Sequence, residues 1–225
     1  MPPFRPRQAL CVIALTLVAG GTLRAAPGPA PASAPAASQP APDRPRSPRL
    51  PSGWHSPMPG GRFAGYRGDT GLDISGRALP VYALAAGRLD YAERGHTRWR
   101  GPRDTDFCVR IELDTPIPWQ GRRVTHLYYA HLRAVDFVQA EGAPARRRVA
   151  AGERLGISGV ANGSPHLHLG FILDGRVEQE TYADILREWD ARKLLGNYRN
   201  GALLPRLPGE PRRDPAPRRA PARGR

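Results

Sequence analysis

The sequence predicts a mainly β protein, with an antiparallel β-sheet or sandwich core and one helix near the C-terminal end. Two observations indicate this fold class. Short apolar and aromatic runs recur between glycine-bearing turns. In addition, every second residue from Leu167 to Leu173 is apolar, the spacing of a strand that buries one face.

The first 25 residues have the layout of a secretory signal peptide. Arg5 and Arg7 precede an apolar run over residues 9–19, and small residues follow it. The run is shorter than the roughly 20 apolar residues of a membrane span, so an uncleaved anchor is the less favoured interpretation. We expect an exported protein of the periplasm or cell envelope, with no stable membrane span after signal cleavage.

Proline-rich segments flank one expected domain. Residues 26–50 are mostly proline, alanine and serine, which predicts an extended linker. Residues 207–225 alternate proline and arginine, which predicts a disordered tail. Between them we place a β domain at 51–180 and a helix with a short extension at 181–206.

The charge and the cysteines limit the classes of partner and of stabilising bond. The formal net charge is +14 and comes almost wholly from arginine, which favours association with acidic envelope polymers. No basic platform interleaved with aromatic residues is present, so we expect no specific nucleic-acid partner. Signal cleavage leaves Cys108 alone, which excludes an intramolecular disulfide.

Six segments have the residue types and turn boundaries of strands. They cover residues 79–84, 88–92, 107–113, 124–132, 154–157 and 167–173. Asp174 and Gly175 have the chemistry of a hairpin turn that would return the last strand antiparallel. The residues 94–106 and 116–123 are expected to be surface loops.

One helix is expected to begin near Thr181. Thr181 and Asp184, three residues later, form a helix-start pattern. Ile185, Leu186 and Trp189 then form an apolar stripe that would pack against the sheet.

Three short motifs contain the residues expected to carry chemistry: Asp69-Thr70-Gly71-Leu72-Asp73, Tyr129-Ala130-His131 and Pro165-His166-Leu167-His168. Strand alternation places His166 and His168 on one face. It places His131 and His126 on opposite faces, so that only one of those two can face the site. An acidic motif with an alternating histidine pair can present a divalent metal with room for a water, which favours metal-dependent hydrolysis.

Taken in order, these motifs resemble the LytM or lysostaphin-type zinc endopeptidases, which cut peptide bonds in the peptidoglycan of bacterial cell walls. The resemblance covers roughly residues 60–175. The family pattern is H-x-G-x-D, then a strand that ends in Tyr-Ala-His, then Pro-His-Leu-His. Here Asp69 stands where that pattern has its first histidine.

The resemblance implies a role for each matched residue. Asp73 and His168 would be ligands of Zn²⁺, and Asp69 would occupy the place of the remaining metal ligand. His131 and His166 would be catalytic without ligating, one taking a proton from water and the other stabilising the oxyanion. The sequence leaves these two roles unassigned, and the implied partners are peptidoglycan peptides.

Asp69 has more than one interpretation. A carboxylate ligates zinc at about 2.0 to 2.2 Å but is shorter than an imidazole, so the backbone must approach the ion more closely. Gly68 and Gly71 also make Asp69 a good turn residue. In a third interpretation His96 folds back to supply the missing imidazole. Two carboxylates with one imidazole cancel the charge of the ion, which predicts a slower or differently tuned enzyme.

Two functions therefore stay open at the level of sequence. The first is an exported zinc endopeptidase that acts on peptidoglycan. The second is a catalytically degenerate domain that binds peptidoglycan or activates a partner cell-wall hydrolase. Occupancy by metal would discriminate between them, and the isolated histidines His55, His96 and His126 are expected to be structural or exposed.

Overall fold

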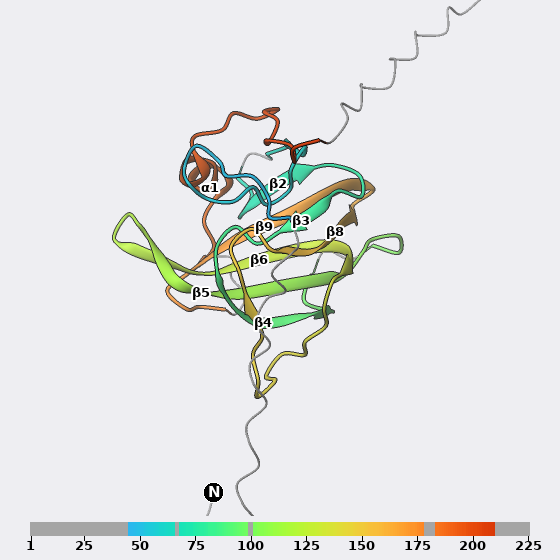
Figure 1. The fold of residues 1–225 in the computed structure, drawn as a ribbon, viewed down its shortest axis with the longest axis vertical. Coiled ribbons are helices and arrows are strands. Elements are labelled where there is room, and N and C mark those ends of the chain that lie inside the picture. The colour runs from blue at the N-terminus through green and yellow to red at the C-terminus, as the bar shows by residue number, and fades with distance from the viewer. Residues whose placement is uncertain (1–44, 66–67, 99–100, 178–182, 210–225) are drawn as a thin grey trace, which may run out of the picture. The chain divides into compact units, whose positions relative to one another are not determined.

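The computed structural model describes residues 45–65, 68–98, 101–177 and 183–209, all within one compact unit of the chain, residues 36–225. Nine strands form one sheet in the order β1-β2-β9-β8-β6-β5-β4-β7, with β3 paired to β8 and β9 also paired to β6 (Figure 1). The strands are β1 (Arg62–Phe63), β2 (Leu72–Ser75), β3 (Pro80–Tyr82), β4 (Gly87–Arg94), β5 (Phe107–Trp119), β6 (Arg122–Val135), β7 (Arg148–Val149), β8 (Arg154–Ala161) and β9 (Ser164–Leu173).

The mainly β, antiparallel fold is confirmed, since every strand pair is antiparallel. The pairing of β6 with β9 sets its core. Tyr129 lies opposite Leu169, and Leu127 lies opposite Phe171, and all four side chains are fully buried in the main apolar cluster. The intervening residues point to the other face, where a smaller cluster includes Tyr128 of β6. That second face carries the candidate site.

The strands β5 and β6 are longer than the sequence indicates, which corrects the expectation of a loop at 116–123. β5 runs to Trp119 and β6 resumes at Arg122. Gln120 and Gly121 both have positive φ, 45° and 78°, which is the backbone of a two-residue hairpin turn. The short strands β1, β2 and β7 were not predicted, and β2 contains Asp73.

The helix α1 (Glu188–Leu195) begins seven residues later than the sequence predicts. Thr181 lies outside the described residues. Asp184 and Leu186 instead run extended along β9, because the Asp184 carbonyl accepts from the Leu173 N–H at 2.7 Å and the Leu186 N–H donates to Phe171 at 3.0 Å. The hydrogen bonds of a returning strand therefore outcompete a first helical turn at this place.

The turn at Asp174-Gly175 forms, and the end of the predicted linker contacts the β domain. Asp174 and Gly175 adopt φ of 53° and 72°, so the hairpin turn forms. The folded domain begins before residue 51, because the Ser47 N–H donates to the Gly152 carbonyl at 3.1 Å and Leu50 is buried in the core. The signal peptide, residues 26–44 of the linker and residues 210–225 of the tail lie outside the described residues. Among the described residues, no helix has the length and apolar character needed to cross a membrane.

Candidate metal centre

The centre starts from the register between β2 and β9. Asp73 lies directly opposite His168 in this antiparallel pair, so both side chains leave the same face of the sheet. His168 Nδ1 lies 2.9 Å from Asp73 Oδ1. Asp73 is 7% exposed, and a carboxylate so well buried requires a cationic or hydrogen-bonding partner.

Asp69 reaches the same place from the loop before β2. The returning segment after β9 holds this loop, because the Gly71 N–H donates to the Leu186 carbonyl at 2.6 Å and the Glu188 N–H donates to the Asp69 carbonyl at 2.9 Å. Gly71 has φ of 85°. A Cβ there would lie 2.7 Å from the carbonyl oxygen of Leu169 and 2.9 Å from His168 Nε2. A glycine at position 71 is therefore what lets the Asp69 loop approach β9.

The structure brings Asp69, Asp73 and His168 together, with one potential ligand atom from each lying within 4.8 Å of the others. We call these three residues the metal cluster. Zinc donors at about 2.1 Å from an ion are at most roughly 4 Å apart, so small side-chain adjustments would close the cluster around a cation. The donor set of two carboxylates and one imidazole thus fits a divalent ion in chemistry and in spacing.

His131 enters the site through an unusual backbone conformation. By strict alternation His131 would share the core face with Tyr129, yet its ring centroid lies 5.0 Å from that of His166 and 6.1 Å from that of His168. Its φ of 64° lies in the left-handed region, which residues with a Cβ rarely adopt. This turn of the backbone rotates the imidazole onto the site face. The sequence gives no signal for it.

A hydrogen bond from the preceding loop holds the strained residue. Thr105 Oγ1 donates to the His131 carbonyl at 2.9 Å and accepts from the Val160 N–H at 2.9 Å. Thr105 lies in the predicted loop 94–106, so this loop contacts the backbone of a site residue. Gly159 leaves room for the Thr105 hydroxyl, because a Cβ at position 159 would overlap it.

His131 is neutral at physiological pH. Burial lowers the pKa of its imidazole to about 4, and the neighbouring His166 and His168 rings act in the same direction. Its Nδ1 is buried without a hydrogen-bond partner among the described residues. A buried ring nitrogen without a partner is rare in folded proteins and often marks a functional site.

His166 is oriented by its own strand. Its Nδ1–H donates to the Ser164 carbonyl at 2.9 Å, which leaves the lone pair on Nε2. That Nε2 lies 3.8 Å from Asp73 Oδ1. His166 therefore presents a proton-accepting nitrogen beside the metal cluster.

All five residues predicted for the site line one pocket of about 380 Å³, a size suited to a peptide or other small ligand. The remaining lining residues are Ala161, Asn162 and Ser164, which come from the end of β8, the turn and the start of β9. The sequence analysis did not anticipate Asn162 and Ser164. Both follow from the tight β8–β9 turn, in which Asn162 and Gly163 have positive φ.

The other histidines lie away from this pocket. His96 stacks on Tyr91 at 3.8 Å and its Nε2 lies 3.0 Å from Glu93 Oε1, so the interpretation in which His96 replaces the missing ligand is wrong. His55 Nδ1 contacts the Ser47 carbonyl at 2.6 Å. These contacts agree with the expectation that His55 and His96 are structural or exposed.

His126 belongs to a second cluster on the same sheet face as His168. Its register opposite Ile172 places it there, so the prediction that only one of His126 and His131 can face the site side of the sheet is wrong. His126 nevertheless does not line the pocket that His131 lines. Its potential ligand atoms lie within 4.8 Å of those of Asp90 and Glu112. Arg146 contacts Asp90 at 2.6 Å and Glu112 at 2.7 Å, so we call this group the arginine-paired cluster.

Comparisons with known proteins give matches among solved structures alone. No protein-family model matches the chain, and no curated protein matches it. Among solved structures, lysostaphin from Staphylococcus simulans, an antimicrobial peptidase, is 16% identical with a TM-score of 0.47 over 73% of this chain and 59% of its own. The catalytic domain of lysostaphin is 18% identical with a TM-score of 0.37 over 56% of this chain and 84% of its own.

A third solved structure is a mutant catalytic domain of the prophage-encoded M23 protein EnpA from Enterococcus faecalis. It is 18% identical to this chain, with a TM-score of 0.38 over 63% of this chain and 94% of its own. The chain spans about 59% of the length of whole lysostaphin. The chain is distantly similar to these three solved structures.

Proposed function

We propose that the chain is an exported zinc-dependent endopeptidase that hydrolyses peptide bonds in bacterial cell-wall peptidoglycan. One observation carries this proposal. Asp69, Asp73 and His168 converge within 4.8 Å, and two further imidazoles line the same pocket without belonging to that group. A cluster retained only for fold stability would have no need of His131 as a strained, unpartnered imidazole.

Asp69, Asp73 and His168 would hold the ion. Lewis-acid activation of the scissile carbonyl and of water is the chemistry that Zn²⁺ supplies in such a site. Because two carboxylates neutralise a divalent ion, that activation is weaker than with one carboxylate and two imidazoles. We therefore expect a slower enzyme than the family pattern implies.

His166 and His131 would divide the proton chemistry. His166 Nε2 carries the free lone pair, because Nδ1 donates to Ser164, so His166 takes the proton of the attacking water. His131, kept neutral by burial, donates an N–H to the oxyanion of the tetrahedral intermediate, as a neutral imidazole can. Asn162 and Ser164 offer polar groups to the substrate backbone at the pocket rim.

Export and an envelope location belong to the same proposal. Residues 1–25 have signal-peptide layout and the net charge of +14 favours acidic wall polymers. Peptidoglycan peptides are the proposed partners, and we propose neither a specific nucleic-acid partner nor a stable membrane span.

The test uses the purified full chain and isolated peptidoglycan sacculi. We expect about one zinc per chain by elemental analysis, release of soluble peptides with new amino termini, and loss of that release on chelation. His166→Ala is expected to keep the zinc and to lower turnover by roughly 10² to 10⁴-fold, the usual contribution of general base catalysis. His96→Ala, which removes an imidazole outside the pocket, is the matched control and should leave turnover unchanged.

A degenerate domain is the second candidate, and one observation favours it. Asp69 Oδ1 already accepts from the Thr70 N–H at 2.8 Å, as it would in a turn without metal. In that case the chain would bind sacculi or stimulate a partner cell-wall hydrolase without zinc. A chain that binds sacculi, contains no zinc and releases no peptide would overturn the enzyme proposal.

A further inference from the structure

His131 lies where β6 changes its partner strand. Ala130 pairs with His168 of β9, and Leu132 pairs with Ser158 of β8. The left-handed φ of 64° at His131 falls between these two pairs. The regular ladder of hydrogen bonds is interrupted at such a change, and buried backbone groups there need partners from other parts of the fold.

The side chain of Thr105 provides a hydrogen bond at this point. Its Oγ1 lies 2.9 Å from the His131 carbonyl and 3.2 Å from the Val160 carbonyl, and it accepts from the Val160 N–H at 2.9 Å. The Thr105 N–H already donates to the Val160 carbonyl at 2.8 Å. The single hydroxyl proton is therefore available for the nearer acceptor, His131. One hydroxyl thus joins β6 to β8.

Asp104 fixes the same loop to the rim of the site pocket. Its Oδ2 accepts from the Gly101 N–H at 2.7 Å. Backbone hydrogen bonds from Gly101, Asn162 and Gly163 lower the pKa of its carboxyl group, and a carboxylate holds such N–H groups strongly. Asn162 lines the site pocket. Asp104 and Thr105, adjacent in the chain, therefore connect this rim to His131.

The two ends of the loop are also anchored. Arg94 Nη1 donates to Asp106 Oδ1 at 2.7 Å, which joins the end of β4 to the residue before β5. The Tyr128 hydroxyl donates to the His96 carbonyl at 2.6 Å, and Tyr128 is a buried residue of β6. Thr105 thus stands on a supported segment, as a group that orients a site residue must.

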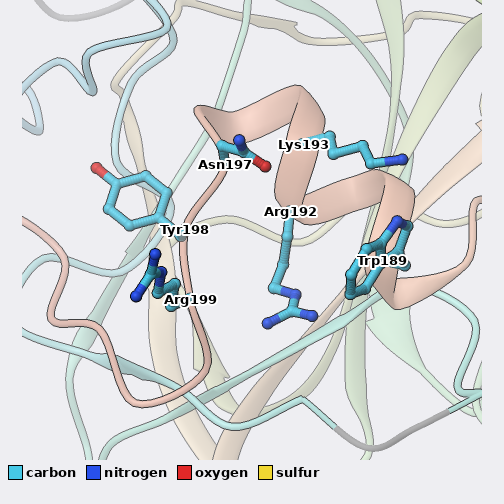
Figure 2. A pocket seen from close by; sticks show the side chains of 6 residues that line it. All are labelled: Trp189, Arg192, Lys193, Asn197, Tyr198 and Arg199. Atoms are coloured by element: carbon cyan, nitrogen blue, oxygen red, sulfur yellow. The ribbon is translucent and has the colours of Figure 1, made fainter.

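The loop that contains Asp69 is held in a different way. The Glu188 N–H donates to the Asp69 carbonyl, and the Gly71 N–H donates to the Leu186 carbonyl, so these bonds are between backbone groups. The side chain of Trp189 on α1 lies in a separate pocket of about 240 Å³ (Figure 2), which shares no lining residue with the site pocket. A substitution cannot remove the backbone bonds of the Asp69 loop, but it can remove a hydroxyl.

We propose that Thr105 is a positioning residue for His131. Its hydroxyl, on a loop held by Asp104, stabilises the left-handed backbone that turns the imidazole into the pocket, and it fixes this imidazole relative to the rim. The inference rests on the proposed function, in which His131 stabilises the oxyanion. A displacement of about 1 Å at such a group costs about a hundredfold in rate.

The first test compares turnover with binding, in the full chain loaded with zinc and with isolated sacculi as substrate. Thr105→Val keeps the shape of the side chain and removes its hydroxyl. We expect peptide release at saturating sacculi to fall about a hundredfold. Zinc content by elemental analysis and co-sedimentation with sacculi should stay as in the parent chain. Thr105→Ser keeps the hydroxyl and should restore most of the turnover.

Thr125→Val is the matched control. Thr125 is also on β6, where its Oγ1 accepts from the Gly175 N–H at 2.8 Å and lies 3.4 Å from the Ile172 carbonyl. The substitution therefore removes the same kinds of bond outside the site pocket, and turnover should not change. Melting temperatures verify each fold. Thr105→Ala, which leaves room for a water at the Val160 N–H, replaces Thr105→Val if that variant melts below the assay temperature.

The second test does not depend on hydrolysis. In the metal-free full chain, the NMR chemical shifts of Cα and Cβ of residue 131 report its left-handed backbone. We expect Thr105→Val to move these shifts and to speed hydrogen exchange of the Val160 N–H, which loses its acceptor. Thr105→Ser and Thr125→Val should leave both measurements as in the parent chain.

The outcomes separate this inference from the proposed function. Unchanged shifts of residue 131 in Thr105→Val would overturn it, whether or not the parent chain hydrolyses peptides. Moved shifts with full turnover, or a loss of zinc that accompanies the loss of turnover, would overturn it as well. So would equal losses of turnover in Thr105→Val and Thr125→Val. Moved shifts in a chain without hydrolytic activity would uphold Thr105 as the residue that orients His131 and refute the enzyme.

Discussion

The metal cluster and the arginine-paired cluster contain the same kinds of side chain, two carboxylates and one imidazole, at the same spacing of 4.8 Å or less. They differ in their counterions. Arg146 bridges the two carboxylates of the arginine-paired cluster, and Arg110 Nε adds a contact of 2.8 Å to Asp90. No arginine among the described residues pairs with the carboxylates of the metal cluster.

The comparison indicates that the types of potential ligand do not by themselves define a metal site. Where guanidinium groups already neutralise the carboxylates, a cation would have to displace them and the protein would lose charge-assisted hydrogen bonds. Where no described arginine pairs with the carboxylates, as in the metal cluster, a divalent ion can supply the neutralising charge. The second difference is the pocket of about 380 Å³, which the metal cluster lines and to which no residue of the arginine-paired cluster contributes.

The largest expected effect is a difference in zinc content between variants of the two clusters. His168→Ala is expected to lower zinc affinity and peptide release by at least about a hundredfold, since even the loss of a supporting partner costs 10 to 100-fold. His126→Ala should leave the zinc content unchanged, although it costs stability of roughly 1 to 3 kcal/mol as a buried substitution. Equal loss of zinc in both variants would end the distinction between the clusters.

A pH titration of stability should show the burial of His131. Its pKa is lowered to about 4 in the folded protein from an ordinary value of 6.5, so the folded state favours the neutral ring. Stability is then fully present above pH 6.5 and falls as the pH drops toward 4, by about 3 kcal/mol in total. Urea unfolding of the metal-free protein at several pH values measures this loss.

The control for this titration is His131→Asn. Asparagine tolerates the left-handed backbone of residue 131 and does not titrate. His126, whose pKa burial also lowers, contributes equally to both proteins and cancels in the difference. Parallel curves for the wild type and His131→Asn would contradict the assignment of the pH dependence to His131.

The Asp69→His substitution tests whether the side chain at position 69 is a metal ligand. A longer imidazole with no charge of its own restores the ligand set of the family pattern, so we expect zinc affinity to rise about tenfold, equivalent to about 1.4 kcal/mol. Competition with a chromophoric chelator measures the affinity, and Asp114→His on β5 is the control. An unchanged dissociation constant would identify Asp69 as a turn residue only.

The smallest effect concerns Arg146. In a His168→Ala background, Arg146→Ala removes the counterion of Asp90 and Glu112. Because the Arg146 side chain is 33% exposed, the loss of stability is expected to be only about 1 kcal/mol. Added zinc should then raise the melting temperature of this variant but not that of the background. If zinc gave no shift, counterions would not be what distinguishes the two clusters.

Local patterns in the sequence predicted the sheet and the candidate residues. The spacing of Leu167, Leu169 and Phe171 predicts a strand with one buried face because side chains alternate along any strand, and β9 has that form. The same rule failed for His131, since one left-handed residue reverses the alternation. The φ angle of His131 is stabilised by a hydrogen bond from Thr105, which lies in a distant loop. The residues next to His131 in the sequence therefore do not indicate it.

The helix shows the same limit. A helix-start pattern near Thr181 competes with backbone hydrogen bonds that β9 and the Asp69 loop offer to residues 184–188. These partners lie more than ten residues away in the chain, so local propensity cannot weigh them. As a result α1 begins at Glu188, and Trp189 is 61% exposed instead of packing in the core.

The amino-acid sequence by itself determined the mainly β class, the turn at Asp174-Gly175 and the residue types of the candidate centre, because each depends on neighbours within a few positions. Tertiary structure alone decided which carboxylates stay free of arginine, how the His131 ring turns toward His166, and which segment holds Asp69. Those features depend on contacts between strands that are distant in the chain, and electrostatic partners act through space and not along the backbone.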